Sequence, residues 1–321
     1  MKSFQETYTE LQDITGDDSA EFLVMLKRWI NDTMHSAYGT NGGKMKFLEA
    51  TKDITTAAST ARYALPGNCR RIMTVTTTPD SGATIYRPRP VDDPDYWNYL
   101  QSRNAGDSDI TQFYYREGDD LLVWPDYASA SKTITVRYRK TTPDLSRADY
   151  TTGTITSITN GDETLTGAST SWLARKPAAG QWIRIDYTSG DFLWYRVDSI
   201  TSDTVLELDR KYNGTSIAAD TETYTMGEFS ELPGEFHPLL FYRPLALAYD
   251  HMENPTMSAR YWNLYDGGHE AGLSTKVGGM LKKMIDEQSG ITDSGYYPPM
   301  NTETPISPED LSREDLIGEG W

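Results

Sequence analysis

The chain has 321 residues, of which 30 are basic and 47 acidic, for a formal net charge of −17 at pH 7. At roughly 150 residues per domain, this length predicts about two folded units. The acidity opposes adhesion to phosphate backbones and to anionic membranes, and it argues against sequence-independent DNA binding.

The single cysteine and the first residues of the sequence exclude further kinds of site and classes of protein. Cys69 cannot form an internal disulfide, and it excludes a zinc site built on paired thiolates. The first residues lack the apolar run that a signal peptide needs, and no stretch approaches about 18 consecutive apolar residues. We therefore expect a soluble protein that does not contact the membrane and is not secreted by the usual route.

Residues 1–50 predict a helical hairpin. Ser3 is the candidate cap of the first helix, and residues 15–17 break it. Asp18, with Glu21 three positions on, predicts a capping box at the start of a second helix that ends near Gly39. The apolar faces are Phe4, Tyr8 and Leu11 in the first helix and Phe22, Leu23, Leu26, Trp29, Ile30 and Met34 in the second. This apolar side must cover another part of the protein.

Residues 51–149 predict a central β-sandwich-like domain, because Thr, Val and Tyr runs alternate here with turn dipeptides. The expected strands are 53–56, 61–65, 71–78, 84–87, 111–116, 120–124 and 133–139. Turns at 80–82 and 117–119 offer the positive-φ positions that tight hairpins require. A short helix at 92–100, with carboxylates at its positive end, would pack Trp97 and Leu100 across the open face of the sheet.

Residues 150–228 predict an inserted small β-barrel. Asn160-Gly161 is a strong two-residue turn between strands at 154–158 and 164–166. Further strands are expected at 182–187, 192–200 and 204–208, where Ile183, Ile185 and Tyr187 share one face. The segments on either side differ in character, so we interpret this domain as an insertion before the C-terminal helices.

Residues 233–285 predict helices again, and with residues 1–50 they would form one helical part of an α+β protein. A break at Asn254-Pro255 precedes a long helical pattern that reaches Met284. This pattern contains five glycines, at positions 267, 268, 272, 278 and 279. Each weakens a helix by about 1 kcal/mol, so they indicate either close packing against a neighbour or real breaks.

The last segment, 286–321, holds nine acidic residues and one basic residue, and so has a local charge of −8. Prolines at 298, 299, 305 and 308 predict an extended tail. Scattered apolar side chains in an acidic background suit a peptide that orders against a partner, and a merely disordered acidic tail is the alternative. The candidate partner-interface residues are Tyr296, Tyr297, Ile306, Leu311, Leu316, Ile317 and Trp321.

Motifs for catalysis, cofactors and metals are not found. The string 269–273 starts with His-Glu but has Leu273 where the zinc-protease pattern needs a second histidine. The glycine-rich run 39–44 has Met45 where a phosphate loop needs Ser or Thr. Cys69 has no adjacent base and is expected to be a buried structural thiol. We therefore expect no enzyme, no cofactor and no metal.

Carboxylates and aromatics leave weaker alternatives. The aspartates at 92, 93 and 95, or at 17 and 18, could serve glycoside chemistry or bind calcium, but helix starts explain both groups without a ligand. Trp182, Trp194 and Tyr195 could form a sugar-binding face, although such residues are more often core in a β-barrel.

Several longer motifs follow one another in a fixed order. The helical hairpin precedes Tyr63-Ala-Leu-Pro-Gly-Asn-Cys-Arg-Arg-Ile72 and Phe113-Tyr-Tyr-Arg-Glu-Gly-Asp-Asp-Leu-Leu-Val-Trp-Pro125. Then come Ile134-Thr-Val-Arg-Tyr-Arg139, Pro143-Asp-Leu-Ser146 and Leu232-Pro-Gly-Glu-Phe-His-Pro-Leu-Leu240. In this order and spacing the chain resembles the head-to-tail adaptor, or connector, proteins of tailed bacteriophages, over most of residues 1–250.

The resemblance implies a structural virion protein: a homo-oligomeric ring, of about twelve subunits, below the portal. The ring would extend the DNA channel and join the phage head to the tail, with its helices facing the portal or the lumen. Its partners would be the portal protein and the next tail or stopper protein, and genomic DNA would pass through the lumen without sequence-specific binding. The location would be the head–tail interface of the virion, and the host cytoplasm during assembly.

Two other functions compete with this interpretation. One is a carbohydrate-binding phage tail or surface protein that uses the inserted barrel, and the other is an acidic glycosidase. Neither accounts for the N-terminal helical hairpin or the long acidic tail.

Overall fold

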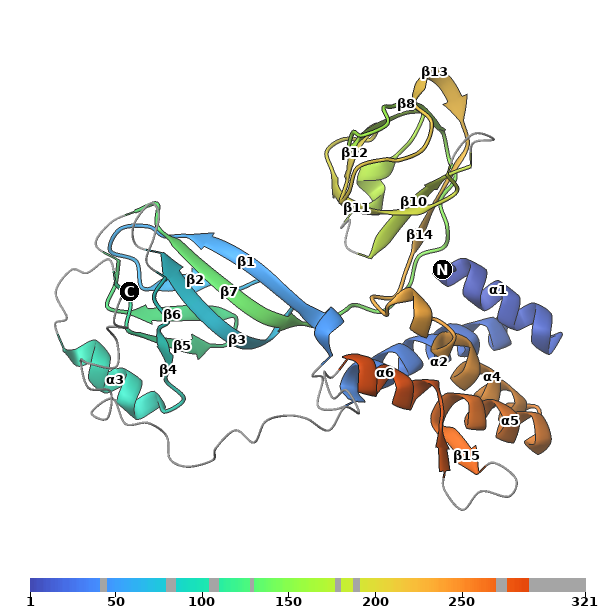
Figure 1. Cartoon of the computed structure of the whole chain (residues 1–321), viewed down its shortest axis with the longest axis horizontal. Coiled ribbons are helices and arrows are strands. Elements are labelled where there is room, and N and C mark those ends of the chain that lie inside the picture. The colour runs from blue at the N-terminus through green and yellow to red at the C-terminus, as the bar shows by residue number, and fades with distance from the viewer. Residues whose placement is uncertain are drawn as a thin grey trace, which may run out of the picture.

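The structure is a computed structural model, and it describes residues 1–40, 45–78, 85–103, 110–127, 130–176, 180–186, 191–269 and 276–288. These residues form three lobes (Figure 1): a helical lobe, a central β domain and a curled β-sheet, here called the half-barrel. The expected mixture of helices and sheets is confirmed.

The helical lobe brings both ends of the sequence together. Its helices are α1 (Phe4–Thr15), α2 (Ala20–Gly39), α4 (Leu239–His251), α5 (Pro255–Asp266) and α6 (Met280–Gln288). One hydrophobic core joins these helices, with Leu11, Ile30 and Met284 completely buried in it. The apolar side of the N-terminal hairpin is therefore covered by the C-terminal helices.

The helix starts follow local hydrogen bonding. The Ser3 hydroxyl oxygen accepts from the Glu6 amide at 3.1 Å, and a Glu6 carboxylate oxygen accepts from the Ser3 amide at 2.9 Å, so α1 opens with a capping box. The capping box expected from Asp18 is wrong. Ser19 caps α2 by accepting from the Phe22 amide at 3.3 Å, while Asp17 accepts from the Ser19 amide at 2.9 Å.

Real breaks in the C-terminal helical pattern, one of the two explanations that its five glycines left open, are confirmed. Helix α5 ends at Asp266, and the strands β15 (Gly267–His269) and β16 (Lys276–Gly278) pair before α6 begins. Gly267 has φ +95°, and a Cβ on Gly279 would lie 2.4 Å from the Gly267 nitrogen. These two glycines therefore make real breaks, because no side chain fits the close crossing between them.

The central β domain has two sheets. One has the order β1 (Glu49–Thr55), β7 (Thr133–Lys140), β3 (Cys69–Thr78), and the other has the order β2 (Arg62–Ala64), β6 (Asp120–Trp124), β5 (Phe113–Glu117), β4 (Arg89–Pro90). A 3-10 helix at Lys46–Leu48 leads into β1. Side chains of both sheets share one core, which includes Val75 and Val136 of the first sheet and Leu121 and Val123 of the second.

Helix α3 (Pro94–Ser102) covers the other side of the second sheet. Trp97 and Leu100 are 3% and 4% exposed there, as the sequence predicted. Asp93 caps α3 by accepting from the Asp95 amide at 2.9 Å, so these aspartates have a structural role. The strand expected at 84–87 is wrong as far as it is described, since Tyr86 forms only an isolated bridge with Thr77. The turn expected at 80–82 lies outside the described residues.

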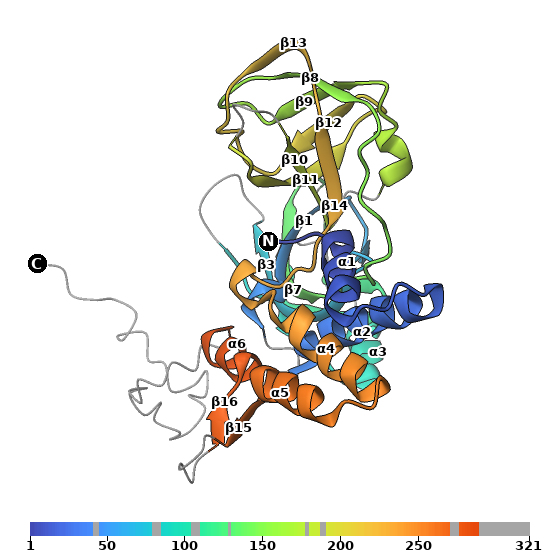
Figure 2. The same cartoon turned by 90° about the vertical axis from the view of Figure 1, so that its right-hand side faces the viewer.

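The half-barrel is one sheet of seven strands in the order β13-β8-β9-β12-β11-β10-β14. The strands are β8 (Thr154–Ile158), β9 (Thr164–Ala168), β10 (Gln181–Ile185), β11 (Trp194–Ile200), β12 (Val205–Leu208), β13 (Ile217–Glu222) and β14 (Tyr224–Glu228). Only Thr223 separates β13 from β14, so these two strands follow each other directly in the chain although they lie at opposite ends of the strand order. Figure 2 shows β14 running from the half-barrel toward α1.

The half-barrel has its own core. Ile183 and Ile185 point into it, as expected, and Gly161 takes the positive φ of the predicted turn. Trp172, in a 3-10 helix at Trp172–Arg175, is fully buried and donates its Nε1–H to the Tyr224 hydroxyl at 3.0 Å. The sequence did not predict β13 or β14.

Candidate functional site

The predicted tail anchors, Tyr296, Tyr297, Ile306, Leu311, Leu316, Ile317 and Trp321, all lie outside the described residues. The structure therefore places none of them. Their role stays a prediction, and the candidate site must be sought in the three lobes.

Histidine and cysteine side chains do not form a reactive group in the described part of the chain. His35 contacts Asp144 on the surface, whereas His237 is buried and hydrogen-bonds the Leu232 carbonyl at 3.0 Å. Burial lowers the pKa of His237 to about 4 and raises the pKa of the Cys69 thiol. Among the residues searched, no group of three or more His, Cys, Asp or Glu side chains could hold a metal ion.

Of the three aromatic residues considered as a sugar-binding face, Tyr195 lies in the core of the half-barrel, whereas Trp182 and Trp194 pack on Phe229 after β14. Tyr195 and Trp194 are buried, at 1% and 8% exposed, and Trp182 packs on Phe229 with ring centroids 5.7 Å apart. Trp194 lies on the same Phe229 ring at 4.7 Å. These contacts favour the core interpretation over the sugar-binding one.

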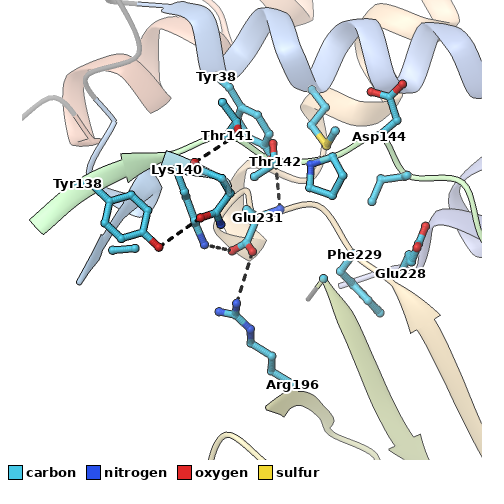
Figure 3. A pocket seen from close by; sticks show the side chains of 16 residues that line it. Tyr38, Tyr138, Lys140, Thr141, Thr142, Asp144, Arg196, Glu228, Phe229 and Glu231 are labelled. Carbon is cyan, nitrogen blue, oxygen red and sulfur yellow. Dashed lines mark hydrogen bonds and ion pairs between the residues drawn. The ribbon is translucent and has the colours of Figure 1, made fainter. Parts of the chain in front are cut away.

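The three lobes meet around a cavity of about 200 Å³. Figure 3 shows its lining, which comes from α2, from the end of β7 and the segment after it, and from the segment after β14. Tyr38 of α2 is 5% exposed, and its hydroxyl lies 2.8 Å from the Ser230 hydroxyl and accepts from the Glu231 amide at 2.9 Å. Burial raises the pKa of Tyr38 far above its ordinary value.

Glu231 connects all three lobes at this cavity. Its carboxylate lies 2.9 Å from Lys140 Nζ, at the end of β7, and 3.5 Å from an Arg196 guanidinium nitrogen in β11 (Figure 3). Its backbone amide reaches Tyr38 of the helical lobe. The Lys140 side chain is only 12% exposed, so this contact is well shielded from water. We call Glu231, Tyr38, Lys140 and Arg196 the three-lobe junction.

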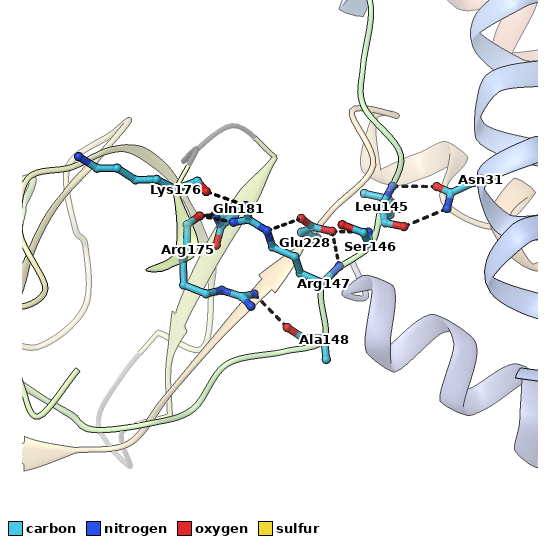
Figure 4. Close-up of polar contacts among 9 residues, drawn as sticks. All are labelled: Asn31, Leu145, Ser146, Arg147, Ala148, Arg175, Lys176, Gln181 and Glu228. Atoms are coloured by element: carbon cyan, nitrogen blue, oxygen red, sulfur yellow. Dashed lines mark hydrogen bonds and ion pairs between the residues drawn. The ribbon is translucent and has the colours of Figure 1, made fainter. Parts of the chain in front are cut away.

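The segment that leaves β7 for the half-barrel is held on both sides (Figure 4). Asn31 of α2 donates to the Leu145 carbonyl at 2.9 Å and accepts from the Leu145 amide at 2.8 Å. Glu228 of β14 accepts from the amides of Ser146 and Arg147 at 2.7 and 2.8 Å. The Asn31 and Glu228 side chains, hydrogen-bonded to the backbone of residues 145–147, therefore hold this segment to the helical lobe and to the half-barrel at once.

Arg147 and Asp149 extend this fixation. Arg147 lies 3.5 Å from Glu228 and donates to the Lys176 carbonyl at 2.7 Å (Figure 4). Asp149 accepts from the Ser3 hydroxyl at 2.8 Å, and burial raises the pKa of its carboxyl group. A Cβ at Gly227 would lie 2.7 Å from both Asp149 Oδ1 and Ser3 Cβ, so only glycine allows this approach of α1 to β14.

No local sequence pattern predicts this junction, because its members at positions 38, 140, 196 and 231 are far apart along the chain. Each is an ordinary polar residue in its own segment. The arrangement contains no nucleophile with an adjacent base, and its carboxylates are neutralised by arginine and lysine. What it can do is hold three lobes at fixed angles.

The helical lobe has more half-buried apolar side chains around its core than the half-barrel, although the half-barrel exposes Leu173, Phe192 and Leu193. Among the described residues, thirteen partly buried hydrophobic side chains surround the core of the helical lobe, whereas Tyr150 alone packs in this way on the core of the half-barrel. Among exposed apolar residues of this lobe, Val24 is 67% and Leu264 42% exposed. We call this set of half-buried and exposed apolar side chains the apolar rim. A surface of this kind is typical of a protein that packs against another copy or partner.

A comparison with protein families decides what kind of protein has this architecture. The family model described as SU10 adaptor protein matches residues 3–178, more than half of the chain. The chain belongs to the SU10 adaptor protein family. This is a phage head–tail adaptor family, so the resemblance inferred from the order of motifs is confirmed.

The match of the SU10 adaptor model runs from α1 through the central β domain and into the half-barrel. A search of curated proteins finds none that matches the chain. Membership of the SU10 adaptor family indicates a structural role at the phage head–tail junction, in the virion, with portal and tail proteins as neighbours. In the part of the chain that the structure describes, no helix is both long and apolar enough to span a membrane.

Proposed function

We propose that the protein forms a homo-oligomeric ring, of about twelve subunits, that binds below the portal, extends the DNA channel and joins the phage head to the tail. The observation that carries this proposal is the match to the SU10 adaptor family over residues 3–178. The next tail or stopper protein would dock on the opposite side of the ring. Assembly would take place in the host cytoplasm.

The apolar rim supports an oligomer. A ring of identical subunits needs a head-to-tail interface, in which one surface of a copy packs on a different surface of the next. The helical lobe offers thirteen half-buried apolar side chains on several helices, and contacts with a neighbour would remove them from water. We propose that this lobe makes the main contact between subunits.

The charge distribution supports a channel that does not hold DNA. Residues 51–149 carry 13 basic and 13 acidic residues and are neutral, whereas the helical part, residues 1–50 and 233–285, carries 10 basic and 13 acidic ones. A lumen lined by the acidic helical lobe would repel phosphates and let the genome pass. The neutral central β domain would then face outward.

The tail and the half-barrel would complete the assembly. The acidic tail 286–321 would clamp an adjoining subunit or the portal through its apolar anchors, Tyr296 and Trp321 among them. The half-barrel would lie on the outside of the ring or contact another tail protein. The three-lobe junction would hold it at the angle that this contact requires.

Native mass spectrometry and negative-stain imaging of the purified protein, alone and with portal, test the proposal. We expect rings of one size that bind the portal. Val24→Glu should abolish ring formation without unfolding the chain, because Val24 is 67% exposed on the apolar rim. Ile85→Glu is the matched control, since Ile85 is 65% exposed but lies in the central β domain. A persistent monomer that ignores the portal would overturn the proposal.

A further inference from the structure

An aromatic strip crosses the end of the central β domain. Trp124 and Phe113 lie next to each other on the second sheet, with ring centroids 6.0 Å apart. The Phe113 ring meets Tyr96 of α3 edge-on at 6.2 Å, and Tyr96 stacks on Tyr99 at 6.2 Å. These four rings, which we call the aromatic strip, form one continuous series.

The outer half of this strip is not part of the core. Helix α3 already buries Trp97 and Leu100 against the sheet, and those side chains fill the contact on its inner face. Tyr96 and Tyr99 are 43% and 48% exposed, so their removal would cost the fold little. A stacked pair of exposed tyrosines on a short, firmly seated helix is typical of a binding surface.

Arg103 lies at the outer end of the strip, and the backbone of Arg89 lies beside Phe113 near its middle. The guanidinium carbon of Arg103 lies 4.8 Å from the centroid of the Tyr99 ring. Arg89 pairs with Phe113 in the parallel ladder between β4 and β5. The strip therefore combines apolar ring faces with a positive charge at its outer end.

Surfaces of this composition recognise proline-rich peptides. A polyproline II helix loses little entropy on binding and inserts its prolines between aromatic rings, and an acidic residue beside the prolines pairs with arginine. The chain carries such a peptide in its own tail: Pro305-Ile-Ser-Pro308, followed directly by Glu309 and Asp310. This segment also contains Ile306, one of the predicted anchors.

We propose that residues 304–310 of the tail bind to the aromatic strip of an adjoining copy. The inference rests on the proposed function, because the adjoining copy is the neighbouring subunit of the proposed ring. Pro305 and Pro308 lie three positions apart, so in a polyproline II helix they share one face with a spacing of about 9 Å. That spacing lets one proline lie on each side of the Tyr96–Tyr99 pair. Glu309 then reaches Arg103.

The length of the tail allows this contact. Sixteen residues, 289–304, separate the end of α6 from Pro305, and fully extended they span roughly 50 Å. Figure 1 shows α3 at the end of the central β domain that is remote from α6. A tail of this length can therefore extend well beyond its own helical lobe.

Photo-crosslinking in the full-length assembled protein tests the contact. A photo-reactive phenylalanine analogue at Tyr99 should crosslink to peptides that contain residues 304–310, as identified by mass spectrometry. The same analogue at Phe192 is the control, because Phe192 is 58% exposed on the half-barrel and should give no crosslink to the tail. Rings mixed from isotopically heavy and light subunits show which copy supplies the peptide, and we expect heavy–light pairs.

Variants test the chemistry of recognition. Pro305→Ala together with Pro308→Ala should lower the crosslink yield at least tenfold, whereas the matched pair Pro298→Ala and Pro299→Ala should leave it unchanged. Arg103→Glu should lower the yield by a similar factor, and Glu309→Arg in the same chain should restore it. Restoration by the exchanged charges would not occur if Arg103 acted only on the stability of α3.

Each outcome bears on the inference separately from the ring itself. Intact rings in which Tyr99 crosslinks elsewhere, or only within one copy, would overturn the inference and leave the proposed function standing. Crosslinks to residues 304–310 that form only between copies support it. Absence of any ring would count against the proposed function, and the docking of the tail on an adjoining copy would fall with it.

Discussion

Replacing Glu231 by glutamine should loosen the three-lobe junction. Glutamine keeps the size of the side chain but removes the charge that faces Lys140 at 2.9 Å and Arg196 at 3.5 Å. At an effective dielectric constant of about 20, two charges 2.9 Å apart attract by about 6 kcal/mol, and the cost of their desolvation offsets most of this. A charge-assisted hydrogen bond in a shielded place retains about 1.5–3 kcal/mol.

The Arg196 contact adds little to this figure, because that side chain is 37% exposed and solvent screens it. We therefore expect Glu231→Gln to lower the free energy of opening at the junction by about 2 kcal/mol, or roughly thirtyfold in the opening equilibrium. Native-state hydrogen exchange at the amides of residues 231 and 232 measures this directly, since these amides donate to Tyr38 and Ser230. They should exchange roughly thirtyfold faster.

Two further variants make the test specific. Glu235→Gln removes a carboxylate that is exposed on the surface nearby, and it should leave exchange at the junction unchanged. In a Lys140→Met background, Glu231→Gln should accelerate exchange by much less than in the native chain, because the main partner is already gone. Acceleration below threefold in the native background, or an equal effect in both backgrounds, would refute the reasoning.

Three other changes have definite expected outcomes. Burial lowers the pKa of His237 from 6.5 to about 4, so the unfolded chain binds the proton first as the pH falls. The free energy of unfolding is therefore full above pH 6.5 and falls toward pH 4, with about 2 kcal/mol lost between pH 7.5 and 5. Urea titrations should show that this slope is reduced in His237→Phe. Trp172→Ala empties a fully buried site and should lower the stability of the half-barrel by about 3–5 kcal/mol. Hydrogen exchange should become faster in β9 and β12 and stay unchanged in α1 and α2. Equal acceleration in the helices would contradict separate cores. Gly227→Ala places a Cβ 2.7 Å from Asp149 Oδ1 and should separate α1 from β14. The Asp149 amide, which donates to Gln5, should then lose its protection from hydrogen exchange. Amides in the core of the half-barrel should remain protected.

Local patterns predicted those elements whose cause is local. Strands β6 and β8 match the predicted residues 120–124 and 154–158, and α3 packs Trp97 and Leu100 as its spacing indicated. Each of these elements follows from alternation or periodicity within a few residues. The glycines beyond Asp266 left breaks in the helix open, but local patterns could not locate them, because the crossing of Gly267 and Gly279 depends on two segments twelve residues apart.

The junction could not be predicted, because its chemistry depends on the tertiary fold. In the sequence, Tyr38 is an ordinary residue on the apolar face of a helix, and Lys140 is an ordinary polar residue at the end of a strand. Only the return of the chain after β14 brings Glu231 to both of them. Strand β14 was missed for a similar reason: Tyr224-Thr-Met-Gly-Glu228 has a glycine inside it, and the glycine serves the approach of α1 and not the strand.

The isolated β-bridge between Tyr150 and Met226 has a consequence for the evolution of this chain. The two residues pair at the base of the half-barrel, so the chain goes out to this lobe and comes back at nearly the same point. A lobe with adjoining ends and a complete core of its own can be gained, lost or exchanged as a cassette without moving the rest of the fold. In the proposed ring, such an exchange would change the surface that this lobe offers and leave the contacts of the helical lobe unchanged.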